Sequence, residues 1–225
     1  MKKSVVYWSP CLDKVGTVKS TLNSAISLAK YSKDYDVTII NVFGEWSSYY
    51  KYLEQNNVKL QNLTFDYYNL LPKKGFLKSR LSYIIIFLIS FIPLLLLIKK
   101  IKPDYLIIHL ITSLPLFLLN FFKLKTQVIL RISGFPKMNL LRKKLWIKSQ
   151  NKIFKITCPT EQLKNDLITK NIFKDEKMET LFDAIINIKD LIKKKIKLIL
   201  KILERYKKIF FYQQGDLLNK KTLSI

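Results

Sequence analysis

The chain has 225 residues, of which 49% are hydrophobic and 13% aromatic, so it can bury a sizeable core, and this composition excludes a disordered protein. Its 40 Lys and Arg against 16 Asp and Glu give a net charge of +24, which indicates an anionic partner. Composition alone leaves nucleic acid, anionic lipid and a phosphorylated substrate open. Cys11 and Cys158 lack metal-ligand or redox spacing, which argues against a disulfide framework and fits a reducing compartment.

The first residues alternate between strand and helix patterns. Residues 4–8 are a short β-rich run, a loop containing Pro10 and Gly16 follows, and residues 21–33 have helical spacing. Residues 35–43 are a nearly continuous apolar run, as expected for a parallel strand covered on both faces. We therefore predict an opening βαβ unit with a right-handed crossover and no secretory signal before it.

Residues 81–98 form an uncharged apolar run that would extend about 27 Å as a helix, which is close to the length needed to cross a bilayer. Basic residues flank both ends, and Pro93 interrupts the run. A crossing would place the opening unit and the later strands on opposite sides of the membrane. Of the two alternatives, we favour a cytoplasmic helix that packs on the sheet and dips its outer face into the bilayer interface.

The rest of the chain continues the alternation. Strands are expected at 57–65, 103–110, 126–132, 155–158 and 177–185. Residues 139–150 have helical spacing, and a further helix should start at Pro159 or Thr160 with Glu161 in its first turn. The predicted fold class is α/β, a Rossmann-like open parallel sheet with helices on both faces. We expect this domain over residues 1–188, a basic amphipathic linker helix over 189–208, and a further strand and turn over 209–225.

One histidine is the main catalytic candidate. The sequence has no Walker A, G-x-G-x-x-G, H-E-x-x-H or nucleophile-elbow motif, and because His109 is the only histidine, a Ser-His-Asp triad elsewhere is excluded. His109 lies at the carboxyl end of a predicted strand, where open α/β sheets bind ligands. A histidine satisfied within the core is the equally weighted alternative.

Two loops should lie at the same edge of the sheet. Gly16 would let the backbone approach a ligand, and the helix after it offers free amide groups to a phosphate. In the loop of residues 130–137, Arg131, Ser133 and Gly134 are possible contacts to an anionic or sugar ligand, although ordinary turns explain both loops as well. Lys137 and Arg142 join Arg131 as candidates for binding an anionic acceptor.

The segments "VVYWSPCLDKVGTVKSTLNSAISLAK", "KPDYLIIHL", "LRISGFPKMNLLRKKLW", "ITCPTEQLKNDL" and "KMETLFDAIINIKD" suggest a family. Their order resembles the amino-terminal domain of a bacterial family 4 glycosyltransferase, a protein of two Rossmann domains known as the GT-B architecture. The resemblance covers about residues 4–190, and "CPTEQLKNDL" followed by "LFDAIINI" is its most specific part. Ala184 stands where relatives usually have Pro.

The final segment "FFYQQGDLLNKK" is similar to the start of the second, donor-binding domain of such enzymes. The resemblance matches Gly215 to the glycine and Lys220 or Lys221 to the lysine of the donor site, while Asp216 replaces the usual arginine. The family's paired glutamates would lie further downstream. The resemblance therefore implies a chain truncated at the start of the donor domain, inactive alone or active with a separately encoded donor domain.

The resemblance implies transfer of a sugar, of hexosyltransferase type, from a nucleotide sugar to a lipid-linked or polysaccharide acceptor. It implies no cofactor beyond the nucleotide-diphosphate sugar co-substrate and no catalytic metal. The absence of a secretory signal, the apolar run 81–98 and the basic residues predict a cytoplasmic protein attached peripherally to an anionic membrane surface. The alternative is a non-enzymatic membrane-associated binding protein or scaffold. Nucleic acid is not expected as a partner, because the basic residues are spread out and no aromatic stacking platform is evident.

Overall fold

A computed structural model describes residues 2–13, 16–72, 75–183 and 192–204. The chain divides into two compact units, residues 1–185 and 186–225. In the second unit residues 192–204 are helical, inside the range predicted for the basic helix. The strand and turn predicted for 209–225 lie outside the described residues, and the proposed domain boundaries stay a prediction.

The first unit is built on one parallel sheet of seven strands in the order β3-β2-β1-β4-β5-β6-β7. The strands are β1 Lys3–Trp8, β2 Tyr35–Asn41, β3 Lys59–Asn62, β4 Tyr105–Ile108, β5 Gln127–Arg131, β6 Lys155–Cys158 and β7 Met178–Thr180. Every pairing between neighbouring strands is parallel. The predicted Rossmann-like α/β fold is therefore confirmed.

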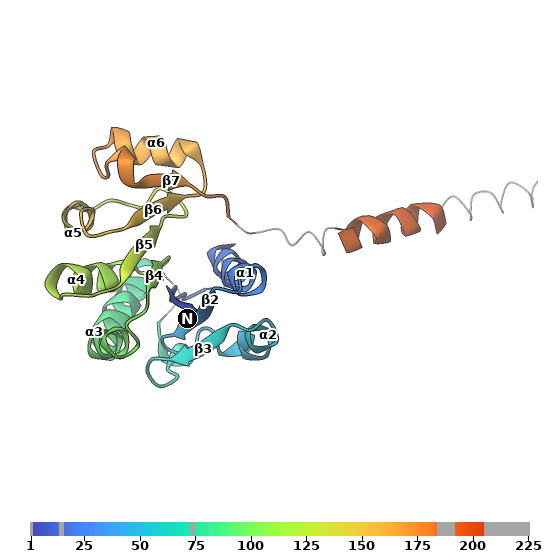
Figure 1. The fold of residues 1–225 in the computed structure, drawn as a ribbon, viewed down its shortest axis with the longest axis horizontal. Helices are drawn as coiled ribbons and strands as arrows, with labels where there is room; N and C mark the ends of the chain where they lie inside the picture. The colour runs from blue at the N-terminus through green and yellow to red at the C-terminus, as the bar shows by residue number, and fades with distance from the viewer. Residues whose placement is uncertain (1, 14–15, 73–74, 184–191, 205–225) are drawn as a thin grey trace, which may run out of the picture. The chain divides into compact units, whose positions relative to one another are not determined.

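Helices cover both faces of this sheet, and Figure 1 shows α1 and α2 on one side with α3, α4 and α5 on the other. The helices are α1 Gly16–Tyr31, α2 Tyr50–Gln55, α3 Phe76–Ile101, α4 Ser113–Phe121, α5 Leu140–Ser149 and α6 Glu161–Thr169. The predicted start of α1, at Thr21, is too late. The helix already begins at Gly16, and Val18 in its first turn is buried against the sheet. The short α2 was missed, since only Leu53 of its six residues is buried.

The strand β1 explains how one sheet separates two cores. Successive side chains of a strand point to opposite faces, so Val6 and Trp8 enter one hydrophobic cluster while Val5 and Tyr7 enter the other. The first cluster holds the buried hydrophobic residues of α3 to α6, and the second those of α1 and α2. A strand covered on both faces reads as a continuous apolar run, which is why the central strands were predictable.

The helix α3 contains the apolar run 81–98 and is longer than predicted. Within the described residues it is the one helix long and apolar enough to cross a membrane, by length and composition, with 33% of that stretch buried. Ile86, Leu94 and Ile98 are buried in the first cluster, so α3 packs on the sheet as expected. Pro93 lies inside the helix without ending it, although it cannot donate to the carbonyl of Ile89.

Candidate functional site

The candidate site lies at the carboxyl edge of the sheet, between β1 and β4. From β1 the chain builds outward through β2 and β3, then crosses to the other side of β1 to add β4 and the later strands. Such a reversal of strand order is where open α/β sheets bind ligands. Ser9 follows β1 and His109 follows β4, and the His109 amide donates to the Trp8 carbonyl at 2.9 Å. The strand ends therefore bring Ser9 and His109 together.

His109 is buried and is the centre of a chain of hydrogen-bonded side chains. Its Nδ1 lies 2.5 Å from Thr21 Oγ1 on α1, and its Nε2 lies 2.5 Å from Ser133 Oγ in the loop after β5. Thr21 Oγ1 in turn lies 3.0 Å from Ser9 Oγ. Both ring nitrogens are therefore occupied by hydroxyl groups. The hydrogen-bonded chain of side chains ends at Ser133, which is only partly buried.

His109 is neutral at physiological pH. Burial, followed by the positive charge of Arg131, lowers the pKa of His109 to about 4, although Asp183 acts in the opposite direction. A neutral imidazole has one donor and one acceptor, so the bond to Thr21 decides whether Nε2 donates to Ser133 or accepts from it. In either tautomer the bond holds Ser133 Oγ in place beside the imidazole ring.

A buried ion pair lies beside this hydrogen-bonded chain of side chains. Arg131, the last residue of β5, donates to Asp183 through Nε at 3.1 Å and also through Nη2, and the two side chains are 9% and 16% exposed. Its other donors reach the Leu181 carbonyl at 2.9 Å and Thr157 Oγ1 at 3.4 Å. Ser20 Oγ on α1 donates to Asp183 at 2.7 Å. The pair thus connects β5, α1 and the segment after β7.

The pKa of Asp183 lies below its usual value. Burial acts to raise this pKa, but the hydrogen bonds from Arg131 and Ser20, together with the charge of Arg131, outweigh it. The carboxylate is therefore charged at neutral pH, and its Oδ1 accepts hydrogen bonds from both Arg131 and Ser20. Arg131 was predicted to contact an anionic ligand, and in the structure its donors serve this internal carboxylate.

Of the remaining predicted residues, Gly16, Gly134, Lys137 and Arg142 lie at or near the same edge. Gly16 begins α1 instead of lying in the loop before it, and a side chain at Gly16 or Gly134 would meet no atom within 4 Å. Lys137 and Arg142 are exposed where α5 starts, and Arg142 Nη1 donates to the Lys137 carbonyl at 2.8 Å. Gly215 and Lys220, predicted for the donor, lie outside the described residues.

Sequence reasoning missed Ser9, Ser20, Thr21 and Asp183. A signal existed for the α1 residues, because hydroxyl side chains recur at three- and four-residue spacing along a helix that follows a buried strand. Such a row faces the sheet instead of solvent, and Ser20 and Thr21 are both buried. No comparable signal marks Asp183, because its partner is 52 residues away along the chain.

Glu45 is a second buried acid at this edge, in the turn after β2. Its carboxylate accepts from the backbone amides of Val42 at 3.1 Å and Phe43 at 2.8 Å. Burial, with a smaller contribution from the charge of Asp66, raises the pKa of Glu45 to about 7 despite these bonds. Gly44 has a φ of +99°, and a side chain there would meet the Asp66 carboxyl group at 2.2 Å. This arrangement holds the turn and leaves Glu45 no free oxygen directed at a substrate.

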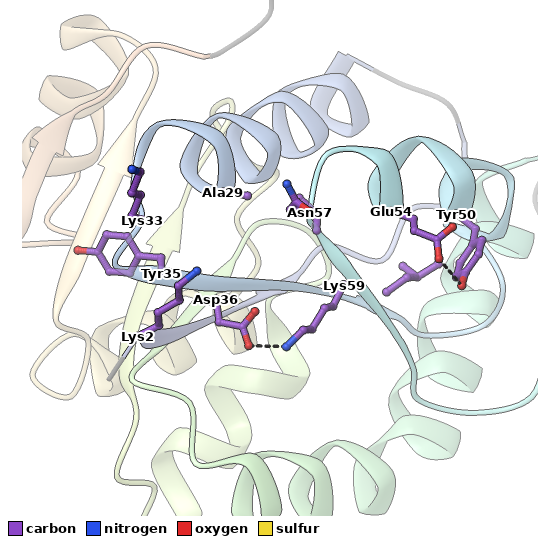
Figure 2. A pocket seen from close by; sticks show the side chains of 11 residues that line it. Lys2, Ala29, Lys33, Tyr35, Asp36, Tyr50, Glu54, Asn57 and Lys59 are labelled. Carbon is purple, nitrogen blue, oxygen red and sulfur yellow. Dashed lines mark hydrogen bonds and ion pairs between the residues drawn. The ribbon is translucent and has the colours of Figure 1, made fainter.

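A hollow of about 710 Å³ lies elsewhere, at the opposite edge where β1, β2 and β3 begin. Figure 2 shows Lys2, Lys33 and Lys59 around it, with Lys59 paired to Asp36 at 2.5 Å and Tyr50 bonded to Glu54 at 3.2 Å. These charged groups are exposed and partly neutralise one another. Among the residues that the structure describes, no three His, Cys, Asp or Glu side chains are grouped to hold a metal ion.

No protein-family model matches the sequence, and no curated protein matches it. Among solved structures the chain is similar to UDP-GlcNAc 2-epimerase from Neisseria meningitidis bound to UDP-GlcNAc, with a TM-score of 0.52 and 17% identity over 91% of this chain and 53% of that one. It is also similar to Glycyrrhiza uralensis UGT73P12 complexed with glycyrrhetinic acid 3-O-monoglucuronide, with a TM-score of 0.57 and 10% identity over 81% and 48% of the two chains.

The calicheamicin glycosyltransferase CalG4 is more distant, with a TM-score of 0.45 and 13% identity over 78% of this chain and 44% of that one. The epimerase and UGT73P12 similarities show a shared fold, a Rossmann-like α/β domain of the GT-B type. This chain spans about half the length of each of these proteins.

Proposed function

We propose that the chain forms the acceptor-side half of a glycosyltransferase, related to family 4, which transfers a sugar from a nucleotide sugar to a lipid-linked or polysaccharide acceptor. The observation that carries the proposal is the hydrogen-bonded chain from Ser9 to Ser133, which crosses the strand-order reversal at the carboxyl edge. The fold shared with a protein bound to UDP-GlcNAc supports it by analogy.

In this proposal Ser133 contacts the acceptor hydroxyl and His109 positions Ser133. With a pKa of about 4, His109 is too weak a base to remove a proton efficiently near neutral pH. Its contribution is geometric, because a fixed Ser133 hydroxyl orients the attacking oxygen toward the anomeric carbon. We therefore assign His109, predicted as catalytic, to a positioning role.

The start of α5 would bind the charged and apolar parts of the acceptor. A hollow of about 530 Å³ is lined by Met138, Leu140 and Leu141 together with Asn139 and Lys143. Lys137 and Arg142 are exposed next to it. An apolar surface beside several cations suits an acceptor that joins a lipid chain to a phosphate.

Donor binding falls to residues outside this site. The leaving diphosphate would be stabilised electrostatically by the donor domain, for which Gly215 and Lys220 remain candidates. Because the chain spans about half the length of the similar structures, activity should be measured both alone and with a separately supplied donor domain.

The test is a transfer assay with the full chain, membrane extract as acceptor source and a panel of radiolabelled UDP- and GDP-hexoses. We expect Ser133→Ala to lower kcat at least tenfold with little change in the acceptor KM, and Arg142→Ala to raise that KM. Lys125→Ala is the matched control, because Lys125 is exposed before β5, away from the site. Wild-type transfer by both site variants would contradict the assignment.

A binding role without catalysis is the second candidate. The specific observation in its favour is that both His109 nitrogens and the guanidinium of Arg131 are occupied by groups of the same chain. A non-enzymatic membrane-associated protein would bind the acceptor, lose that binding in Arg142→Ala, and incorporate no label with any donor or donor domain.

A further inference from the structure

The helix α3 presents a continuous aliphatic surface to the outside of the fold. Six residues at three- and four-residue spacing are between 51% and 79% exposed, and we call them the outer stripe. The outer stripe consists of Leu77, Leu81, Ile84, Leu88, Ile92 and Leu96. It contains no polar side chain over a helix that is about 39 Å long.

The side of α3 that faces the core is more polar than the outer stripe. Its fully covered residues are Ser82, Ile86, Ser90, Leu94 and Ile98. Ser82 Oγ donates to the Pro72 carbonyl at 2.6 Å, so the helix satisfies a polar group inside the protein. A surface helix of a soluble domain has the reverse arrangement, with polar residues outside. The composition of α3 therefore fits an outer face that meets an apolar medium.

The charged side chains on α3, α4 and α5 have one sign. Lys78 and Arg80 lie near the start of the outer stripe and Lys99 and Lys100 at its end, all exposed. On the far side of α4 (Figure 1), α5 adds Arg142, Lys143, Lys144 and Lys148, while α3, α4 and α5 contain no Asp or Glu. Lys99 and Lys148 lie over the rings of Phe122 and Phe121, which extend the apolar surface at α4. This face combines an apolar strip with a positive border.

We propose that the outer stripe docks the domain on an anionic lipid bilayer, with α3 lying along the membrane surface. Aliphatic side chains would enter the acyl boundary while the lysines contact anionic headgroups. A second copy of the chain is a poorer occupant, because it would bring two positive faces together. A crossing helix is poorer too, since Ile86, Leu94 and Ile98 would have to leave the core. The proposal does not depend on the proposed sugar transfer.

The test is flotation of the full chain with vesicles of phosphatidylcholine alone or with 30% phosphatidylglycerol. We expect the wild type to bind the anionic vesicles. In Leu88→Ser/Ile92→Ser the ratio of bound to free protein should fall at least tenfold. The matched control is Tyr31→Ser/Tyr52→Ser, which removes exposed apolar side chains from α1 and α2 on the other face. Far-UV circular dichroism and unfolding midpoints establish that each variant is folded.

A third variant tests whether the basic amphipathic helix 192–204, instead of α3, is responsible for vesicle binding. Leu198→Ser/Ile202→Ser removes exposed apolar residues from helix 192–204. Binding lost only in this variant would overturn the proposal, as would equal binding to uncharged vesicles.

The same preparations distinguish the other occupants. A surface-bound helix is released by alkaline carbonate, so resistance to carbonate would indicate a crossing helix and overturn the proposal. A dimer that becomes a monomer in Leu88→Ser/Ile92→Ser, with vesicle binding unchanged, would assign the outer stripe to a second copy. If this variant fails to fold, a fluorophore on Leu88→Cys decides the matter. Its emission should shift to the blue on anionic vesicles, and an unchanged spectrum would overturn the proposal.

Discussion

His109 and Glu45 are buried titratable residues whose pKa values move in opposite directions. His109 titrates at about 4 instead of 6.5, and Glu45 at about 7 instead of 4.5. Burial is the main cause for both, because it disfavours the charged form of each group. Their effects on stability have opposite signs between pH 4.5 and 6.5, so each must be measured by a substitution.

For His109, the unfolded chain binds a proton between pH 6.5 and about 4 that the folded chain does not bind. Stability from this group is therefore lost as the pH falls through that range, by about 3 kcal/mol in total. We expect the difference in unfolding free energy between wild type and His109→Gln to shrink by that amount from pH 7 to pH 4. Urea denaturation at several pH values measures it, and a constant difference would contradict the lowered pKa.

For Glu45, the folded chain keeps a proton between pH 4.5 and about 7 that the unfolded chain releases. Stability from this group is present at low pH and falls as the pH rises, by up to about 3 kcal/mol. Relative to Glu45→Gln, the wild type should therefore become less stable between pH 5 and pH 8. An increase in its relative stability over this range would show that the carboxylate is well accommodated when charged.

Arg131 and Asp183 should be coupled strongly. Removing the guanidinium leaves Asp183 with Ser20 as its charge-stabilising partner, so we expect Arg131→Met to cost about 3 kcal/mol of unfolding free energy. A double-mutant cycle with Asp183→Asn isolates the pair and should give a coupling energy of at least about 1 kcal/mol. Additive losses would mean that Arg131 acts through packing alone.

Among the secondary-structure elements, α6 begins at a cap formed by residues that are close together in the sequence. Thr160 Oγ1 accepts from the Leu163 amide at 3.2 Å, as an N-cap does, and Glu161 lies in the first turn. We expect Thr160→Ala to lower the free energy of unfolding by about 1 kcal/mol and Thr160→Asn to retain most of it. Equal losses in the two variants would point to the methyl group of Thr160 instead of its hydroxyl.

The elements that were predicted from sequence share a local cause. The central strands are buried on both faces, so their sequences are apolar runs. Pro159 and Thr160 indicate the start of α6. What the sequence did not predict depends on distant contacts. The start of α1 depends on Val18 packing against the sheet, and the ion pair of Arg131 depends on Asp183, far along the chain. The contact of Arg131 with an anionic ligand stays a prediction. His109 and Ser133 were both singled out, but their direct contact required the folded sheet.

On the whole molecule, the net charge of +24 acts against folding by self-repulsion. Salt screens exposed charges with a Debye length of about 8 Å at 0.15 M, so we expect the unfolding midpoint to rise between 0.02 and about 0.3 M sodium chloride. The buried Arg131 and Asp183 pair is screened much less. Thermal unfolding at several salt concentrations measures the effect, and a falling midpoint would mean that attractive surface pairs outweigh the repulsion.

The strand order also determines how the protein must be made. The central strand β1 pairs with β4 through Val5 and Tyr105, which are a hundred residues apart. At about 5 to 20 residues per second, a ribosome needs roughly 5 to 20 seconds to supply that partner. The apolar α3 is synthesised within this interval, before the strand that completes its packing surface. The nascent chain therefore exposes this long apolar helix for seconds, which makes α3 the segment where chaperones or the membrane itself would first engage the protein.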